Sequence, residues 1–350
     1  MKKLIKLDPV FKKKVKVFKR YLYIIKDKCD RLDIDYKNKF ADKETVEKET
    51  EKFIKNLSEK IFKTLDAHYQ EMWSILVEKF NFNERNYKRN RAFRVHQEFY
   101  KRQLMNFFIG CEMVQQILYK PLGYAGDFKV MIFLYKNNSP CQNSYYRLID
   151  IYSMNTPIAH SVRSRKDYSI INFKEVIKNK QKNILSVASG SSTEIAELIK
   201  MNLPYCLNIS LLDADKSALE YAKDELSSLT NENINITYHH QNIFEMTKYT
   251  LNTGEQDLIY SLGLFDYLND GLFIRCAKNL YDLLNDTGKL VIGNVSITNT
   301  TRAYMSLVGE WNIIHRSEEE LIKIAQKCRF NNFSIEKDDT GVQLYLIVRK

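Results

Sequence analysis

Residues 182–215 constrain the fold of this chain more than any other segment. Residues 184–188 form an apolar run bounded by small residues, which is typical of a parallel strand covered on both faces. Apolar residues then recur with helical spacing from residue 195 to residue 199, and residues 207–212 form a second apolar run. The segment therefore predicts a strand, a turn, a helix and a second strand at the start of an α/β sheet.

Small residues and an acid follow these two strands. Ser189, Gly190 and Ser191 come after the first strand, and Asp213 stands at the end of the second. Ligands of open α/β sheets bind at the carboxyl ends of the strands, so these residues should lie on one rim. Gly190 would let the backbone approach a ligand, and Asp213 could accept hydrogen bonds from ribose hydroxyls. We expect a nucleotide-cofactor site here. The alternative is an ordinary strand-to-helix turn, since a dinucleotide fingerprint has three glycines and this loop has one.

The remainder of the chain continues the alternation. Strands are predicted at residues 234–238, 257–262 and 288–294, and helices at residues 270–285 and 317–328. Residues 286–288 should stop the first of these helices, and Ser317 with Glu320 should cap the second. Residues 332–336 and 342–348 read as two last strands joined by a hairpin-type connection. The sheet is therefore expected to be parallel until an antiparallel strand at its end.

This order resembles the class I S-adenosylmethionine-dependent methyltransferases. The resemblance implies an α/β fold with a seven-stranded Rossmann-like sheet, a terminal antiparallel strand and a preceding α-helical domain. It implies S-adenosyl-L-methionine as cofactor, which lacks the pyrophosphate that makes the glycine triplet useful in dinucleotide enzymes. Asp215 competes with Asp213 for the ribose and is the weaker match. The cofactor contacts that the resemblance implies are Ala188, Ser189, Gly190 and Ser191 at the methionine end, Asp213 at the ribose, Ala214 as a further contact, Asn242 and Ile243 at the adenine, and Ser261 and Gly263 beside the sulfonium.

Three further segments carry a narrower resemblance. Residues 121–128 (PLGYAGDF), 259–268 (IYSLGLFDYL) and 292–296 (IGNVS) are unusual together, and parts of 159–168 and 302–316 fit the same set. They look like bacterial methyltransferases associated with making 3-hydroxypalmitic acid methyl ester, over about residues 105–350. That family would have Gly-Cys-Gly where this chain has Ala188, Ser189 and Gly190. The resemblance implies O-methylation of the carboxylate of a small or lipid-like acceptor, such as a 3-hydroxy fatty acid.

A carboxylate acceptor requires no general base, because it is already ionised at neutral pH. It requires donors that orient it, and Tyr and Arg suit that role. The loop at residues 123–127 is expected to fold over the cofactor as part of the acceptor pocket. Structural alternatives stay open, because Arg163 and Arg165 could form ion pairs with Asp127 or Asp167, and the tryptophan and histidine could be core residues. The candidates are Tyr124, Asp127, Arg163, Arg165, Tyr267, Trp311, His315 and Arg316.

Residues 1–120 carry helical stripes in place of strand alternation. One stripe begins at Pro9, a second covers residues 46–65, and a third covers about 92–119 as one helix. We expect a helical domain at residues 1–150 that also caps the acceptor site. The cofactor-binding methyltransferase domain is expected at residues 151–350.

Positive charge is concentrated in the first 100 residues, which hold 26 Lys or Arg against 16 Asp or Glu, in a chain of net charge +11. This favours a contact with an acidic carrier protein or an anionic surface, and the alternative is a solvated amphipathic helix. A nucleic-acid methyltransferase is less favoured, since residues 261–265 (SLGLF) lack the Asn/Asp-Pro-Pro-aromatic motif of amino-directed DNA enzymes. A protein methyltransferase and a non-catalytic cofactor-binding scaffold are further alternatives.

The composition limits where such a chain would act. No apolar run approaches the roughly 20 residues of a membrane span, and no early segment has a signal-peptide centre. The six cysteines are scattered without a Cys-x-x-Cys pair, so we expect reduced thiols and no metal site. We expect a cytoplasmic monomer or homodimer that acts on a small-molecule or acyl substrate.

Overall fold

The computed structural model describes residues 6–40, 42–177, 182–201, 206–244 and 253–350. The chain divides into two compact units: Met1–Ala159 with Thr300–Asn312, and His160–Asn299 with Ile313–Lys350. The first unit thus runs to Ala159, where the sequence analysis set its boundary at residue 150, and it also includes Thr300–Asn312. Helix α11 (Arg302–Leu307) lies in this segment and buries Ala303, Tyr304 and Leu307 in the helical core.

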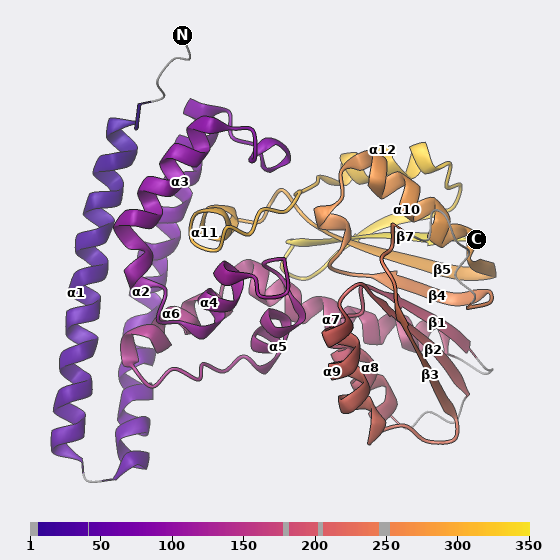
Figure 1. Ribbon diagram of the computed structural model, residues 1–350, viewed down its shortest axis with the longest axis horizontal. Helices are drawn as coiled ribbons and strands as arrows, with labels where there is room; N and C mark the ends of the chain where they lie inside the picture. Colours follow the sequence, from indigo (N-terminus) through magenta and orange to yellow (C-terminus); the bar gives the residue numbers. More distant parts are fainter. Residues whose placement is uncertain (1–5, 41, 178–181, 202–205, 245–252) are drawn as a thin grey trace. The chain divides into compact units, whose positions relative to one another are not determined.

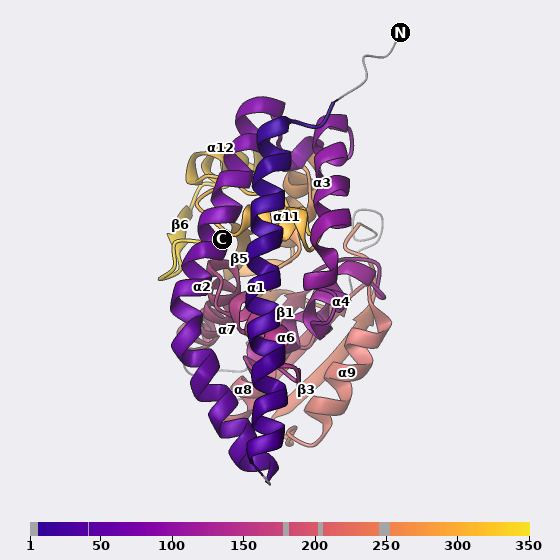
Figure 2. The same ribbon diagram turned by 90° about the vertical axis from the view of Figure 1, so that its left-hand side faces the viewer.

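Two long helices dominate the helical unit. Figures 1 and 2 show α1 (Pro9–Lys39) and α2 (Lys43–Phe80) running antiparallel, side by side. The predicted start at Pro9 is confirmed, and the Asp8 carboxylate caps the helix by accepting a hydrogen bond from the Phe11 N–H at 2.9 Å. The shorter helices are α3 (Arg91–Leu104), α4 (Glu112–Tyr119), α5 (Phe128–Lys136) and α6 (Ser144–Met154), with 3-10 turns at Glu84–Asn86 and Met105–Phe107.

The third predicted helix is wrong as a single element. Helix α3 ends at Leu104, and α4 begins only at Glu112. Gly110 lies in this break, where a Cβ atom would be 2.3 Å from the ring of Tyr146. The chain turns here because Gly110 admits that ring, a tertiary contact that a helical stripe does not encode.

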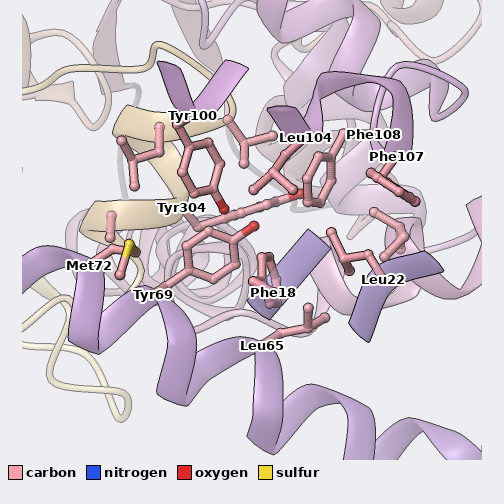
Figure 3. Close-up of a cluster of buried hydrophobic side chains, with 14 of the residues drawn as sticks. Phe18, Leu22, Leu65, Tyr69, Met72, Tyr100, Leu104, Phe107, Phe108 and Tyr304 are labelled. Carbon is pink, nitrogen blue, oxygen red and sulfur yellow. The ribbon is translucent and has the colours of Figure 1, made fainter. Parts of the chain in front are cut away.

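The core of the helical unit is rich in aromatic rings. Figure 3 shows Phe18, Tyr69, Tyr100 and Tyr304 meeting in it from α1, α2, α3 and α11. The rings of Tyr69 and Tyr304 lie 5.0 Å apart, edge to face. Tyr304 therefore fixes α11 in the helical unit.

The sheet of the second unit has seven strands in the order β3-β2-β1-β4-β5-β7-β6. All neighbours are parallel except β7, which runs antiparallel to both β5 and β6. This confirms the predicted fold class, and the strand order reverses between β1 and β4. The strands are β1 (Lys182–Val187), β2 (Leu207–Asp213), β3 (Ile234–His240), β4 (Gln256–Ser261), β5 (Leu284–Val295), β6 (Phe333–Lys337) and β7 (Gln343–Arg349).

Helices cover both faces of this sheet (Figure 1). Apolar side chains of α10 (Asp270–Asp282) and α12 (Glu318–Cys328) fill one core, and those of α7 (Pro157–Val176), α8 (Thr193–Lys200) and α9 (Lys216–Ser227) fill the other. The predicted capping box of Ser317 and Glu320 is present at α12. Helix α10 ends at Asp282, before the predicted residue 285, because Leu284 already pairs with Gln256 of β4.

Candidate functional site

The loop after β1 repeats a left-handed backbone at alternate residues. The φ angles of Ala188, Gly190 and Ser192 are +55°, +54° and +50°. Glycine favours this region, whereas a Cβ atom makes it costly by roughly 1–2 kcal/mol per residue. The loop therefore has the backbone of a glycine-rich turn, although two of these three positions carry side chains.

Asp213 joins this loop to the end of β2. Its Oδ2 accepts a hydrogen bond from the Gly190 N–H at 2.8 Å, and its Oδ1 accepts one from the Asp215 N–H at 2.9 Å. The carboxylate is buried, and burial raises its pKa. Each oxygen keeps a second lone pair, so the group can still accept hydrogen bonds from a ligand. Gly190 and Asp213 thus lie together on the rim where the sequence analysis placed them.

Two serine hydroxyls at this rim lack hydrogen-bond partners within the described part of the chain. They are the Oγ atoms of Ser189, which follows β1, and of Ser261, which ends the neighbouring strand β4. Both side chains are buried, and an unsatisfied buried hydroxyl costs about 1–3 kcal/mol. A ligand that hydrogen bonds to them would remove that cost.

The other predicted cofactor residues make local contacts. The Ser191 hydroxyl hydrogen bonds to the Thr193 hydroxyl at 2.9 Å, and the Ala214 carbonyl to His240 Nε2 at 3.1 Å. Asn242 is exposed, and its side-chain oxygen accepts a hydrogen bond from the Phe244 N–H at 3.0 Å. Ile243 is buried in the sheet core. An adenine contact by Asn242 and Ile243 stays a prediction.

Arg165 reaches the loop after β4 from helix α7. Its Nη1 donates to the Leu262 carbonyl at 3.1 Å, and a Cβ atom on Gly263 would lie 3.2 Å from the same nitrogen. Gly263 therefore lets the guanidinium pack against this loop. Arg163 instead lies beside His160, with Nη2 at 3.1 Å from the ring Nδ1. Burial lowers the pKa of both Arg163 and His160.

Arg316 is completely buried and holds the segment after β4 in place. Its guanidinium donates to the carbonyls of Phe265 and Leu268, to the Asn294 Oδ1 and to the Asp270 Oδ1. These contacts give Arg316 a structural role that the sequence analysis did not assign.

Two more of the predicted acceptor residues adjoin residues of this network in the chain, since Tyr267 lies in the segment after β4 and His315 directly precedes Arg316. Tyr267 follows Asp266 in the 3-10 turn Phe265–Tyr267 and is 37% exposed. His315 is buried, and its Nε2 lies 3.0 Å from the Asn299 side-chain nitrogen. Contact of either residue with an acceptor stays a prediction.

Tyr124 and Asp127 belong to the helical unit, as does Trp311. Asp127 is fully buried and caps α5, since its Oδ1 accepts a hydrogen bond from the Val130 N–H at 3.0 Å. Its Oδ2 accepts a second hydrogen bond, from Gln116 Nε2 at 2.6 Å. Both carboxylate oxygens therefore serve the packing of α4 and α5. Tyr124 is half-buried in the preceding loop.

Sequence reasoning missed Asp266, which lies in the segment after β4. Its Oδ1 accepts a hydrogen bond from the Val295 N–H at 2.6 Å, and its carbonyl accepts one from the Ile314 N–H at 2.7 Å. Burial raises the pKa of Asp266 to about 6, against the opposing charges of Arg165 and Arg316. The residue lies within the distinctive segment 259–268, but nothing in that pattern signals burial.

Glu194 was also missed, in the first turn of α8. Its Oε1 accepts a hydrogen bond from the Tyr260 hydroxyl at 2.8 Å, and burial raises its pKa. The contact joins the start of α8, which directly follows the left-handed loop in the chain, to β4.

No group of three metal-ligating side chains occurs in the described ranges, and none of the helices there is long and apolar enough to span a bilayer.

Neither a family model nor a curated protein matches this sequence. Among solved structures, the chain is similar to a possible exported protein from Bordetella parapertussis, at 17% identity over 64% of this chain and 79% of that one, with a TM-score of 0.53. The chain is also similar to the magnesium protoporphyrin IX methyltransferase of Synechocystis with bound SAM, at 11% identity over 56% of this chain and 84% of that one, with a TM-score of 0.41. It is similar to a Burkholderia thailandensis 1,6-didemethyltoxoflavin-N1-methyltransferase with bound S-adenosylhomocysteine, at 12% identity over 53% of this chain and 78% of that one, with a TM-score of 0.40.

The strand order and the antiparallel β7 decide the fold type. They match the seven-stranded α/β sheet with an antiparallel terminal strand that the resemblance to class I S-adenosylmethionine-dependent methyltransferases implies. The comparisons concern the fold alone, and none supports the narrower resemblance to enzymes that make 3-hydroxypalmitic acid methyl ester.

Proposed function

We propose that this chain is an S-adenosylmethionine-dependent methyltransferase. The observation that carries the proposal is the contact between the left-handed loop at Gly190 and the Asp213 carboxylate, in the loop that follows β1, where the strand order reverses between β1 and β4. Ligands of open α/β sheets bind at such a point.

The residues on this rim fit the cofactor. The Asp213 carboxylate would accept hydrogen bonds from the ribose hydroxyls, and the Ser189 and Ser261 hydroxyls would find the partners that they lack within the described residues. Bound there, the cofactor supplies an electrophilic methyl group on a sulfonium. The residues of this chain would orient the acceptor in line with that methyl group and would exclude water from the site.

We further propose a carboxylate oxygen of a lipid-like acid as the acceptor. Such an oxygen is ionised at neutral pH and is already nucleophilic, so the site needs a cation to orient it and no base. Arg165 is the best-placed candidate, because its guanidinium is held against Gly263 beside the end of β4. A guanidinium can hold a carboxylate through two parallel hydrogen bonds.

A nucleic-acid or protein acceptor is the second candidate, and the basic first helix favours it. The residues Lys12, Lys13, Lys16, Lys19 and Arg20 of α1 are all exposed. A cluster of exposed basic side chains attracts polyanions, and that attraction weakens with salt.

Label transfer distinguishes these acceptors. The purified protein would be incubated with methyl-labelled S-adenosylmethionine and a cell extract, with Asp213→Ala as the control protein. The proposal predicts label in the lipid extract that alkali releases as methanol, as a methyl ester requires. Alkali-stable label in nucleic acid or protein would support the second candidate. Cofactor binding without transfer to any fraction would favour a scaffold.

A further inference from the structure

The outer face of helix α1 exposes apolar side chains to solvent. Figures 1 and 2 show this helix on the outside of the helical unit, beside α2. Val10, Val17 and Ile24 are 45%, 57% and 65% exposed. Eleven large apolar side chains are exposed in the described ranges, and five of them lie on α1. Apolar side chains gathered in this way mark an interaction site, whereas scattered ones need no explanation.

Basic and apolar side chains alternate along one stripe of α1. Val10, Lys13, Val17, Arg20 and Ile24 follow one another at steps of three and four residues, so they share one side of the helix. At 1.5 Å per residue, the stripe is about 21 Å long. Helices that combine aliphatic and basic side chains in this way are typical of the membrane–water interface. There the aliphatic groups enter the acyl boundary, and the long basic side chains reach the headgroups.

The charge on this face is of one sign. From Pro9 to Lys26, the exposed residues of α1 include five basic ones and no acid. The adjacent helix α2 exposes seven basic and seven acidic residues, so exposure to solvent does not by itself separate the charges. Positive charge near the amino end of a helix also opposes the helix dipole, so the lysines do not serve helix stability. The face is therefore complementary to an anionic surface.

An anionic lipid surface accounts for both features, whereas a nucleic acid accounts only for the charge. Phosphates of a nucleic acid would pair with the basic side chains and leave Val17 and Ile24 in water. We propose that the outer face of α1 docks on an anionic lipid surface, with Val10, Val17 and Ile24 in the acyl boundary and the basic side chains on the phosphate headgroups. This docking requires neither cofactor binding nor methyl transfer.

Vesicle sedimentation of the full chain tests the proposal. Vesicles of phosphatidylcholine would be compared with vesicles of phosphatidylcholine and phosphatidylglycerol in equal amounts. We expect binding to the anionic vesicles that is at least about tenfold tighter than to the neutral ones and that weakens with salt. Equal binding to both kinds of vesicle, or no binding to either, would overturn the proposal.

Two aliphatic substitutions separate lipid docking from simple charge attraction. Val17→Ser combined with Ile24→Ser should weaken binding to the anionic vesicles about tenfold, because the acyl boundary no longer receives these side chains. Ile171→Ser combined with Ile322→Ser removes exposed aliphatic side chains from α7 and α12 and should leave binding unchanged. If the first pair bound vesicles as wild type does, and duplex RNA displaced the vesicles, the face would be a nucleic-acid site and the lipid assignment would be wrong.

Three charge substitutions test the basic part of the face. Lys13→Gln, Lys16→Gln and Arg20→Gln together should weaken binding about 100-fold, since each basic residue near an anionic membrane contributes about a factor of five. The matched control removes three exposed lysines of α2, at positions 52, 55 and 60, by the same change to Gln. Both proteins lose the same net charge, so equal losses of binding would contradict docking through α1.

Discussion

The Asp213 carboxylate accepts a hydrogen bond from the Gly190 N–H at 2.8 Å. The bond joins the end of β2 to the left-handed loop after β1, so the acid and the loop are positioned together. A second hydrogen bond joins the same two segments, since the Ser189 N–H donates to the Leu212 carbonyl at 3.1 Å. The proposed cofactor site is therefore one connected piece of structure.

Asp213→Ala should weaken S-adenosylmethionine binding about 10- to 100-fold, since hydrogen bonds to a charged group contribute about 1.5–3 kcal/mol. The matched control is Asp215→Ala, whose Oδ1 caps α9 by accepting a hydrogen bond from the Ser217 N–H at 2.9 Å. The control should lose about 1 kcal/mol of stability and little cofactor affinity. Titration calorimetry checks both, and equal losses of affinity would contradict the role of Asp213.

Ala188→Gly should raise the free energy of unfolding by about 0.5–1 kcal/mol. Glycine relieves the left-handed strain, and its extra freedom in the unfolded chain offsets only part of the gain. Ala196→Gly, in the middle of α8, should instead lower the free energy of unfolding by about 1 kcal/mol. Denaturant unfolding measures both changes. A destabilised Ala188→Gly protein would show that the φ of +55° is not a source of strain.

Asp127→Asn should cost less stability than Asp127→Ala, because Asn caps helices as well as Asp does and keeps an acceptor for the Val130 N–H, although its amide nitrogen replaces the oxygen that accepts from Gln116. Asp127→Ala should cost about 1–3 kcal/mol, since it removes the cap and the partner of Gln116. Thermal and denaturant unfolding check this order. If Asp127→Asn abolished methyl transfer in a stable protein, the carboxylate would have a chemical role beyond capping.

Asp266 should make stability depend on pH between about 4 and 6. Its pKa rises from 3.8 to about 6 on folding, because burial disfavours the ionised form. Its contribution is fully present below the unfolded pKa and is lost as the pH rises through the folded pKa, a loss of about 3 kcal/mol.

The difference between wild type and Asp266→Asn isolates this effect. Asn keeps an acceptor for the Val295 N–H but does not titrate. From pH 4 to pH 7, wild type should therefore lose stability relative to Asp266→Asn, as measured by denaturant unfolding at each pH. Asp282→Asn removes an exposed acid and should run parallel to wild type. Parallel curves for wild type and Asp266→Asn would refute the shifted pKa.

The sheet could be read from the sequence because buried parallel strands appear as short apolar runs. Local signals also sufficed for the start of α1 at Pro9 and for the capping box of Ser317 and Glu320. The break at Gly110 could not be predicted, because it depends on the ring of Tyr146, 36 residues further along the chain. The membership of α11 in the helical unit likewise depends on where Tyr304 packs.

The candidate site was predictable only in part. Strand ends and residue types indicated Gly190 and Asp213, since both lie at carboxyl ends of neighbouring strands. The left-handed backbone at Ala188 and Ser192 is unfavourable for these residue types, so no sequence pattern indicated it. The burial of Arg316 and Asp266 is set by segments distant in the chain, and residue type alone suggested an exposed arginine.

Titration calorimetry of the full chain with S-adenosylmethionine tests the central proposal most directly. We predict saturable binding at one site per chain, with S-adenosylhomocysteine competing for the same site. An absence of binding at millimolar cofactor, in a protein shown to be folded, would contradict it.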